Sequence, residues 1–205
     1  AAFQNDLSAI MRLISVSKGK PVFHMEDEGR DIYCVVKGNA VISVPHPVEG
    51  IMPGHVLSVG KWFSEPATLG QRPRIMSVVA RQPCHLVTVS RSSVELMLRA
   101  KPDYAWNFFN LMAVNVEDYM NHAVDLLIQD PKRRLYSRML TFGGRLIYHL
   151  PESPVTIPLS QEELAVSSNM SRSTVYQMLT ELVDAGICKL GYREIKVLDM
   201  KALAA

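Results

Sequence analysis

The residues best suited to a chemical task lie between positions 160 and 182 of this 205-residue chain. Their sequence, SQEELAVSSNMSRSTVYQMLTEL, predicts two short helices joined by a tight turn. The polar side chains that would face outward from the second helix are Arg172, Ser173, Tyr176, Gln177 and Thr180. Polar groups on one helix face can reach base edges in the major groove of DNA. This stretch therefore predicts a helix-turn-helix that binds double-stranded DNA.

Local signals define where both helices begin. Ser160 and Glu163 form an S-x-x-E capping box for the first helix, and Ser171 can cap the second. Asn169 falls in the turn, where a residue that tolerates positive φ is needed. The apolar stripe of the second helix comprises Val175, Met178, Leu179, Leu182 and Val183. Each polar residue alone is compatible with an ordinary solvated surface, so their shared face carries the DNA-binding hypothesis.

Individual side chains suggest individual roles on DNA. Arg172 is a bidentate donor near the start of the second helix, which suits the O6 and N7 atoms of guanine. Ser171 and Thr174 can donate to phosphates, and Ser160 and Arg193 are weaker phosphate candidates.

A hairpin follows the helix-turn-helix. Gly186 is placed to end the second helix, and the apolar runs 187–190 and 195–198 bracket a turn at 191–194 that contains Arg193. A helix-turn-helix followed by a hairpin is a winged helix.

The first half of the chain is rich in strands. After a start that predicts an amphipathic helix within residues 1–20, short β-branched runs alternate with Gly, Pro and Asn turns. The predicted strands are 31–37, 40–44, 56–59, 75–80 and 85–89. Their spacing predicts a compact antiparallel barrel or sandwich.

Residues 103–129 contain no Pro or Gly and predict one long helix of about 26 residues, roughly 39 Å long. One apolar seam comprises Phe109, Met112, Val116, Tyr119, Ala123 and Leu126, and a second comprises Phe108, Leu111, Met120, Val124, Leu127 and Ile128. The apolar surface exceeds what one small barrel covers, which favours a parallel partner helix from a second copy of the chain. The alternative is a single buried helix in a monomer.

Asp130 and Pro131 are a helix N-cap and first helical residue, and they indicate a hinge. A helix over 132–142 would end at Gly143. We therefore expect an α+β chain with an antiparallel β-barrel over 1–102, a dimerisation helix and hinge over 103–130, and a winged helix over 131–205.

Composition places limits on function. The 48% hydrophobic and 20% charged residues are ordinary for a globular protein, and no apolar run is long enough to span a membrane. The net charge is +2: residues 131–205 hold 10 basic and 7 acidic residues (+3), and residues 1–130 hold 12 and 13 (−1). Three dispersed cysteines suit a reducing cytoplasm and give no support to zinc or iron–sulfur ligation, so no metal ligands are predicted.

The order of barrel, long helix and winged helix resembles the CRP/FNR family of bacterial transcription regulators, over nearly the whole chain. SRSTVYQML at 171–179 resembles the family's S-R-x-T-V-x-x-x-L recognition helix. FSEPATLGQRPRIMSVVA at 63–80 is similar to the phosphate-binding cassette of cyclic-nucleotide-binding domains. The cassette matches are Phe63, Glu65, Ala67, Pro73, Arg74, Ser77, Val78 and Ala80. The resemblance implies a homodimer on a near-palindromic operator, with RNA polymerase as a further partner.

The resemblance also suggests an effector site. Arg74 would hold a cyclic phosphate with its guanidinium, and Glu65 would accept from a ribose hydroxyl. Ser64 replaces the family's glycine, Ile75 follows the arginine where ligand-binding members carry a small residue, and the base-contacting positions fall at Tyr119 and Met120. These departures leave three alternatives open: a cyclic nucleotide, another effector, or a cassette kept only as architecture.

The resemblance places Ser173 and Gln177 where family members contact base edges. The family's glutamate and arginine are absent from these two positions, so the target sequence should differ. Haem binding stays an alternative, because histidines 24, 46, 55, 85 and 122 are residues of a type that can ligate haem iron.

The sequence leaves two other classes of function to consider. The weak basicity also suits a ligand-sensing module that acts through protein partners instead of DNA. An enzyme is the least favoured class, because G-x-S-x-G, H-E-x-x-H and Walker motifs are all missing from the sequence.

Overall fold

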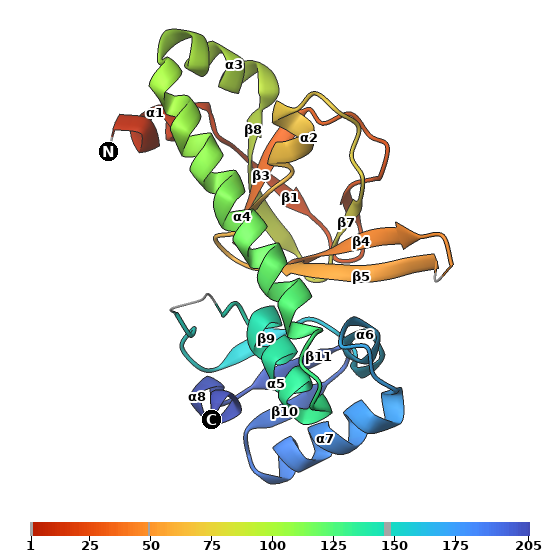
Figure 1. Cartoon of the computed structure of the whole chain (residues 1–205). Helices are drawn as coiled ribbons and strands as arrows, with labels where there is room; N and C mark the ends of the chain where they lie inside the picture. Colours follow the sequence, from red (N-terminus) through yellow and green to blue (C-terminus); the bar gives the residue numbers. More distant parts are fainter. Residues whose placement is uncertain (1, 49, 146–148) are drawn as a thin grey trace. The chain divides into compact units, whose positions relative to one another are not determined.

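The computed structural model of the chain describes residues 2–48, 50–145 and 149–205 (Figure 1). These residues divide into two compact units. The first comprises Ala1–Ile51 with Leu57–Val116, and the second comprises Met52–Val56 with Glu117–Ala205. The predicted domain boundaries at 102/103 and 130/131 stay a prediction.

Residues 12–90 form two four-stranded antiparallel sheets. The strands are β1 (Arg12–Val16), β2 (Pro21–Phe23), β3 (Asp31–Lys37), β4 (Ala40–His46), β5 (Gly50–Leu57), β6 (Trp62–Phe63), β7 (Ser77–Ala80) and β8 (Cys84–Ser90). Their orders are β1-β8-β3-β6 and β2-β7-β4-β5. The predicted strand region is therefore confirmed as two sheets of the jelly-roll type, and the sandwich alternative describes them better than a closed barrel.

Strand alternation builds two apolar clusters. On β3, Tyr33 and Val35 contribute to the cluster that also includes Phe63 of β6 and Val78 of β7. Ile32 points the other way and packs with the second cluster. That second cluster comprises Leu7, Ile32, Val89, Val94 and Phe108. Helices therefore cover the outer face of the first sheet.

The helices of residues 2–125 are α1 (Ala2–Ile10), α2 (Glu65–Leu69), α3 (Arg91–Ala100), the 3₁₀ turn η1 (Pro102–Tyr104) and α4 (Ala105–Asp125). The expected N-terminal helix is shorter than predicted, because residues 12–16 pair with β8 as the edge strand β1. Phe108 of α4 is 5% exposed and packs in the second apolar cluster with Ile32 and Val94.

The long helix is also shorter than the predicted span 103–129. It ends at Asp125, and the next three amides bond to the carbonyl three residues earlier, as in Ile128 N–H to Asp125 O at 3.3 Å. Asp130 then caps a new helix by accepting from the amide of Arg133 at 2.7 Å, as predicted. The helix that begins at Pro131 is separate from α4, because proline lacks the amide donor that a continuous helix would need at this position.

The elements from 131 onward are α5 (Pro131–Phe142), β9 (Val155–Ile157), α6 (Gln161–Ser167), α7 (Arg172–Asp184), β10 (Cys188–Gly191), β11 (Glu194–Val197) and α8 (Met200–Ala204). The three strands form an antiparallel sheet of order β10-β11-β9. Leu135, Leu164, Val175, Leu179 and Ile195 are each fully buried. The predicted winged helix is confirmed, and α8 and β9 are additions to it. Among the described residues, no helix has the length and apolarity needed to cross a membrane.

Candidate functional site

The recognition helix is built as its sequence predicts. The Ser171 hydroxyl accepts from the amide of Thr174 at 3.1 Å and caps α7. Val175 and Leu179 are fully buried, so the opposite face of the helix is directed to solvent. That exposed face carries Arg172, Ser173, Tyr176, Gln177 and Thr180. Burial of the apolar side chains therefore fixes which groups α7 can offer to a ligand.

The preceding helix and turn are equally well determined. Ser160 accepts from the amide of Glu163 at 3.1 Å, and the Glu163 carboxylate accepts from the amide of Ser160 at 2.8 Å. This reciprocal pair is the predicted capping box. Asn169 has a φ of 52° in the turn, as predicted, and Gly186 has a φ of 71° just beyond α7. The left-handed conformation at Gly186 allows the chain to leave α7 and enter β10.

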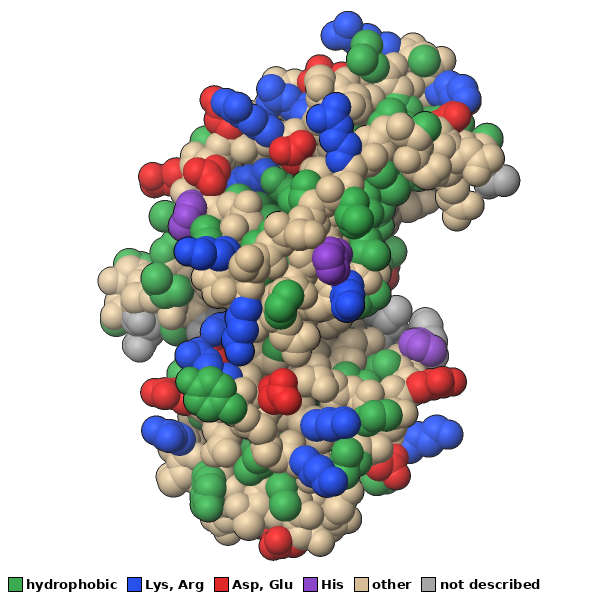
Figure 2. Space-filling model, turned by 180° about the vertical axis from the view of Figure 1, so that it is seen from behind, with side chains coloured by type: hydrophobic (Ala, Val, Ile, Leu, Met, Phe, Trp, Pro, Cys, Tyr) green, Lys and Arg blue, Asp and Glu red, His purple; other side chains and the backbone are tan. Residues whose placement is uncertain are grey.

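The wing is the β10–β11 hairpin, with Tyr192 and Arg193 at its exposed tip. Nη2 of Arg193 lies 3.0 Å from Oε1 of Glu163, so the wing tip is joined to α6 by an ion pair. Basic and acidic side chains are interspersed over the face of the molecule drawn in Figure 2. This mixture agrees with the weak net charge.

The second residue of the cassette has a strained backbone. Ser64 precedes α2 with a φ of 80°, a conformation that favours glycine. Gly29 approaches the same helix so closely that a Cβ atom would lie 2.4 Å from the backbone of Ala67. These close backbone contacts fix the position of α2 against the sheet.

Arg74 lies inside the cassette and is 4% exposed. Its guanidinium donates to the Ser64 hydroxyl, and Nη2 donates weakly to the carbonyl of Asp31 at 3.4 Å. It stacks on the ring of Phe23, 3.8 Å from the centroid. Burial lowers the pKa of Arg74, although a guanidinium stays protonated at neutral pH. A preorganised cation that can exchange a hydroxyl partner for an anion is therefore available here.

Glu65 is 1% exposed and accepts from the side-chain amide of Asn115 on α4. Asn115 also donates to the carbonyl of Trp62 at 3.1 Å. Burial raises the pKa of Glu65, and the Asn115 hydrogen bond opposes that rise. Glu65 and Arg74 therefore bond to neighbouring polar groups, Glu65 to Asn115 and Arg74 to Ser64.

The other effector candidates are more exposed. Ile75 is 76% exposed, Tyr119 39% and Met120 61%. Tyr119 and Met120 belong to the part of α4 in the second unit, whereas Ser64, Glu65 and Arg74 belong to the first. Their role in effector binding stays a prediction.

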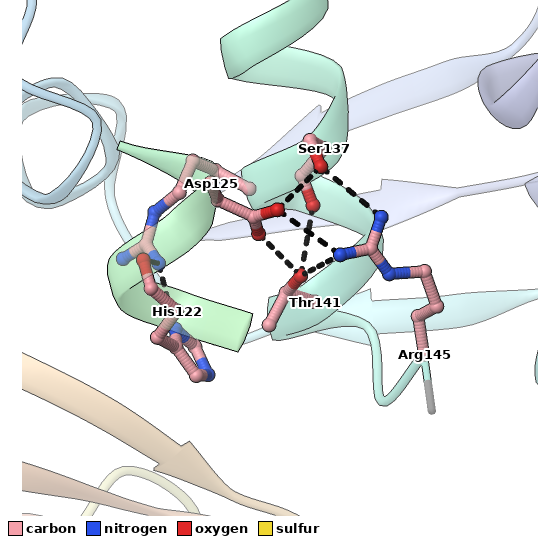
Figure 3. Close-up of polar contacts among 6 residues, drawn as sticks. His122, Asp125, Ser137, Thr141 and Arg145 are labelled. Atoms are coloured by element: carbon pink, nitrogen blue, oxygen red, sulfur yellow. Dashed lines mark hydrogen bonds and ion pairs between the residues drawn. The ribbon is translucent and has the colours of Figure 1, made fainter. Parts of the chain in front are cut away.

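Sequence reasoning missed a polar stripe on α4. Residues 115, 118, 122 and 125 recur at steps of three and four, and Asn115, Asp118 and Asp125 are almost fully buried. Asp125 accepts at 2.6 Å from each of the Ser137 and Thr141 hydroxyls of α5, and Arg145 Nη2 lies 3.1 Å from the same carboxylate (Figure 3). The spacing of the polar residues was the available signal, because it places them on one helix face.

Comparison with known proteins identifies both halves of the chain. The cyclic nucleotide-binding domain family matches residues 13–101, and the Crp-like helix-turn-helix domain family matches residues 133–205. The chain belongs to the CRP/FNR family of transcription regulators. The expectation drawn from the cassette and the recognition helix is thereby confirmed.

Among the relatives of this CRP/FNR regulator is the cyclic AMP receptor protein of Thermus thermophilus, 25% identical over 187 residues, covering 91% of this chain and 83% of the relative. The CRP-like cAMP-activated global transcriptional regulator of Mycobacterium tuberculosis is 22% identical over 203 residues, covering 97% and 89%. The solved structure of FixK2 from Bradyrhizobium japonicum shares the fold, with a TM-score of 0.76, 19% identity and coverage of 95% and 96%.

Proposed function

We propose that this regulator binds double-stranded DNA in a sequence-specific manner as a homodimer. The observation that carries the proposal is the capped helix α7, whose apolar face is buried and whose polar face is exposed. Arg172 would hydrogen-bond to a guanine edge. Ser173 and Gln177 have shorter side chains that can both donate and accept hydrogen bonds, and Tyr176 lies on the same face.

Contacts with phosphates would hold α7 in register. Ser171 and Thr174 have hydroxyls at the exposed start of α7, and their oxygens lie 2.7 Å apart. Ser160 and Arg193 are secondary candidates, since Ser160 caps α6 and Arg193 pairs with Glu163. For Arg193 to bind a phosphate it would have to leave Glu163, so we expect its contribution to be small.

The chemistry of α4 supports a homodimer. Apart from Phe108, the buried side chains of α4 are polar, whereas Phe109 is 61% exposed, Val116 53% and Met120 61%. These three side chains lie on one face of the helix, because 7 and 11 residues are close to whole numbers of turns. A second copy of α4, packed in parallel, would remove this apolar surface from water. Two copies of α7 would then enter successive major grooves about 34 Å apart.

The buried Arg74 supports a small anionic effector in the first unit. Relatives of this chain carry names that refer to cyclic AMP, which makes a cyclic nucleotide the first ligand to test. Arg74 would bind the phosphate after leaving Ser64, and Glu65 would accept from a ribose hydroxyl. Titration calorimetry with cyclic AMP and cyclic GMP, using Arg74→Ala as the control variant, tests this part of the proposal.

DNA binding can be tested by a gel-shift titration with a palindrome selected from random duplexes and with a scrambled duplex of equal length. We expect at least about a thousandfold preference for the palindrome and a steep loss of affinity with added salt. Equal affinity for both duplexes would contradict the proposal. It would favour the second candidate function, a ligand-sensing module that acts on protein partners.

A further inference from the structure

Two histidines and an aspartate meet in the second unit, apart from the recognition helix and the cassette. His55 comes from β5, and Asp118 and His122 come from the polar stripe of α4. One possible ligand atom from each residue lies within 4.8 Å of the others. His55 is 7% exposed and Asp118 5%, so the cluster is shielded from bulk solvent. All three residues belong to the same compact unit.

The three side chains lie close enough together for one small cation to bind all of them after small shifts. Nε2 of His55 lies 3.1 Å from Oδ2 of Asp118, and the rings of His55 and His122 are 4.3 Å apart at their centroids. Metal–ligand bonds of about 2.0–2.2 Å in a tetrahedron separate neighbouring ligand atoms by about 3.3–3.6 Å. Asp118 and His122 are also four residues apart on one helix, a spacing that places both side chains on the same face of α4.

The contact of His122 with Arg138 is compatible with a metal ligand. Nη1 of Arg138 lies 2.7 Å from Nδ1 of His122. A guanidinium has only donors, so this hydrogen bond requires a neutral imidazole with Nδ1 as the acceptor. Neutral imidazole is the form that binds metal ions. The same Nη1 donates to the backbone carbonyl of His122 at 3.2 Å, so Arg138 keeps a partner if it leaves the ring.

We propose that His55, Asp118 and His122 form a binding site for one divalent transition-metal ion of the zinc class, with solvent supplying the fourth ligand. Two imidazoles and one carboxylate are the nitrogen and oxygen donors that such ions prefer. If His122 binds through Nε2, its proton moves to Nδ1 and repels the donor of Arg138; if it binds through Nδ1, the ion replaces that donor. Either way the ion loosens the contact between His122 on α4 and Arg138 on α5.

Co²⁺ is the probe of choice, because its visible d–d bands report ligand type and coordination number. Tag-free full-length protein should bind one Co²⁺ per chain with the strong absorption of a four-coordinate site, and Zn²⁺ should bleach it. Asp118→Asn and His122→Gln should each weaken binding by about tenfold or more. His24→Gln, which changes an exposed histidine, is the matched control and should leave the affinity unchanged.

Arg138→Met separates a metal site from a simple hydrogen-bonded cluster. Removing the buried cation should strengthen Co²⁺ binding, because the ion would no longer face a positive neighbour. Circular dichroism of each variant verifies that it is folded. Absence of d–d bands in the folded wild-type protein would overturn the proposal, as would an equal affinity in wild type, Asp118→Asn and His122→Gln. The readout uses no DNA, so it is independent of the proposed regulatory function.

Discussion

The guanidinium of Arg134 donates from Nε to the backbone carbonyl of Ser168 across 3.1 Å. From Nη1 it also donates to the carbonyl of Ile128 at 2.7 Å. One side chain of α5 therefore holds both the segment that follows α4 and the turn between the two helices of the DNA-binding motif.

Arg134→Ala should lower the free energy of unfolding by about 1–3 kcal/mol, because two backbone carbonyls lose a charged donor. Urea unfolding of the purified variant measures this change. Arg133→Ala is the matched control, since Arg133 is exposed, and it should stay within about 0.5 kcal/mol of wild type. Equal effects of the two substitutions would contradict the role assigned to Arg134.

Ser160→Ala removes one half of the capping box of α6. The expected loss is about 1 kcal/mol of unfolding free energy, since the amide of Glu163 loses its acceptor. Ser173→Ala, at an exposed position in the first turn of α7, is the comparison and should change stability by less than about 0.5 kcal/mol. Thermal unfolding of both variants is sufficient to distinguish them. A Ser160→Ala protein as stable as Ser173→Ala would exclude an energetic role for the cap.

Glu65 should make stability depend on pH. Its folded-state pKa is raised above the ordinary value of 4.5, so the folded chain holds this proton more tightly than the unfolded chain. Its contribution to stability therefore falls as the pH rises from about 4.5 through the raised pKa, by at most about 1.4 kcal/mol per pH unit.

The variant Glu65→Gln keeps an acceptor for Asn115 and lacks this proton. Between about pH 5 and pH 8, the unfolding free energy of the variant should increase relative to that of wild type as the pH rises. A constant difference between the two proteins would mean that Glu65 does not titrate differently in the folded state.

Ser64 is predicted to limit effector binding in two ways: its hydroxyl engages Arg74, and its side chain occupies a position with a φ of 80°. Ser64→Ala removes the hydroxyl only, whereas Ser64→Gly also relieves the backbone. If a cyclic nucleotide is the effector, both variants should bind it more tightly than wild type, and Ser64→Gly more tightly than Ser64→Ala. Calorimetry that gave wild type the highest affinity would show that Ser64 assists binding.

The parts of this fold that could be predicted depend on contacts between near neighbours in sequence. The Ser160–Glu163 box, the positive φ of Asn169 and the restart at Asp130 each involve residues within a few positions, so their spacing was sufficient. Asp125 bonds to residues 12 to 20 positions later, and Glu65 to Asn115, 50 positions away. Such pairs depend on how elements pack, which local periodicity does not specify.

The apolar seam of the long helix illustrates the same limit. Both predicted stripes are apolar, yet Phe108 is 5% exposed and its neighbour Phe109 is 61% exposed. Only the position of α4 against the first sheet distinguishes them. The polar stripe on the same helix was visible in the sequence, but its partner His55 comes from a strand more than 60 positions earlier.

Whether α7 selects a DNA sequence is measured most directly by selection of random duplexes by wild type and by Arg172→Ala in parallel. We expect a near-palindromic motif for wild type. The variant should retain the same half-site spacing, lose the preference at one symmetric pair of positions and bind with about 1–3 kcal/mol less free energy. An identical motif from both proteins, or no motif from wild type, would contradict sequence selection by α7.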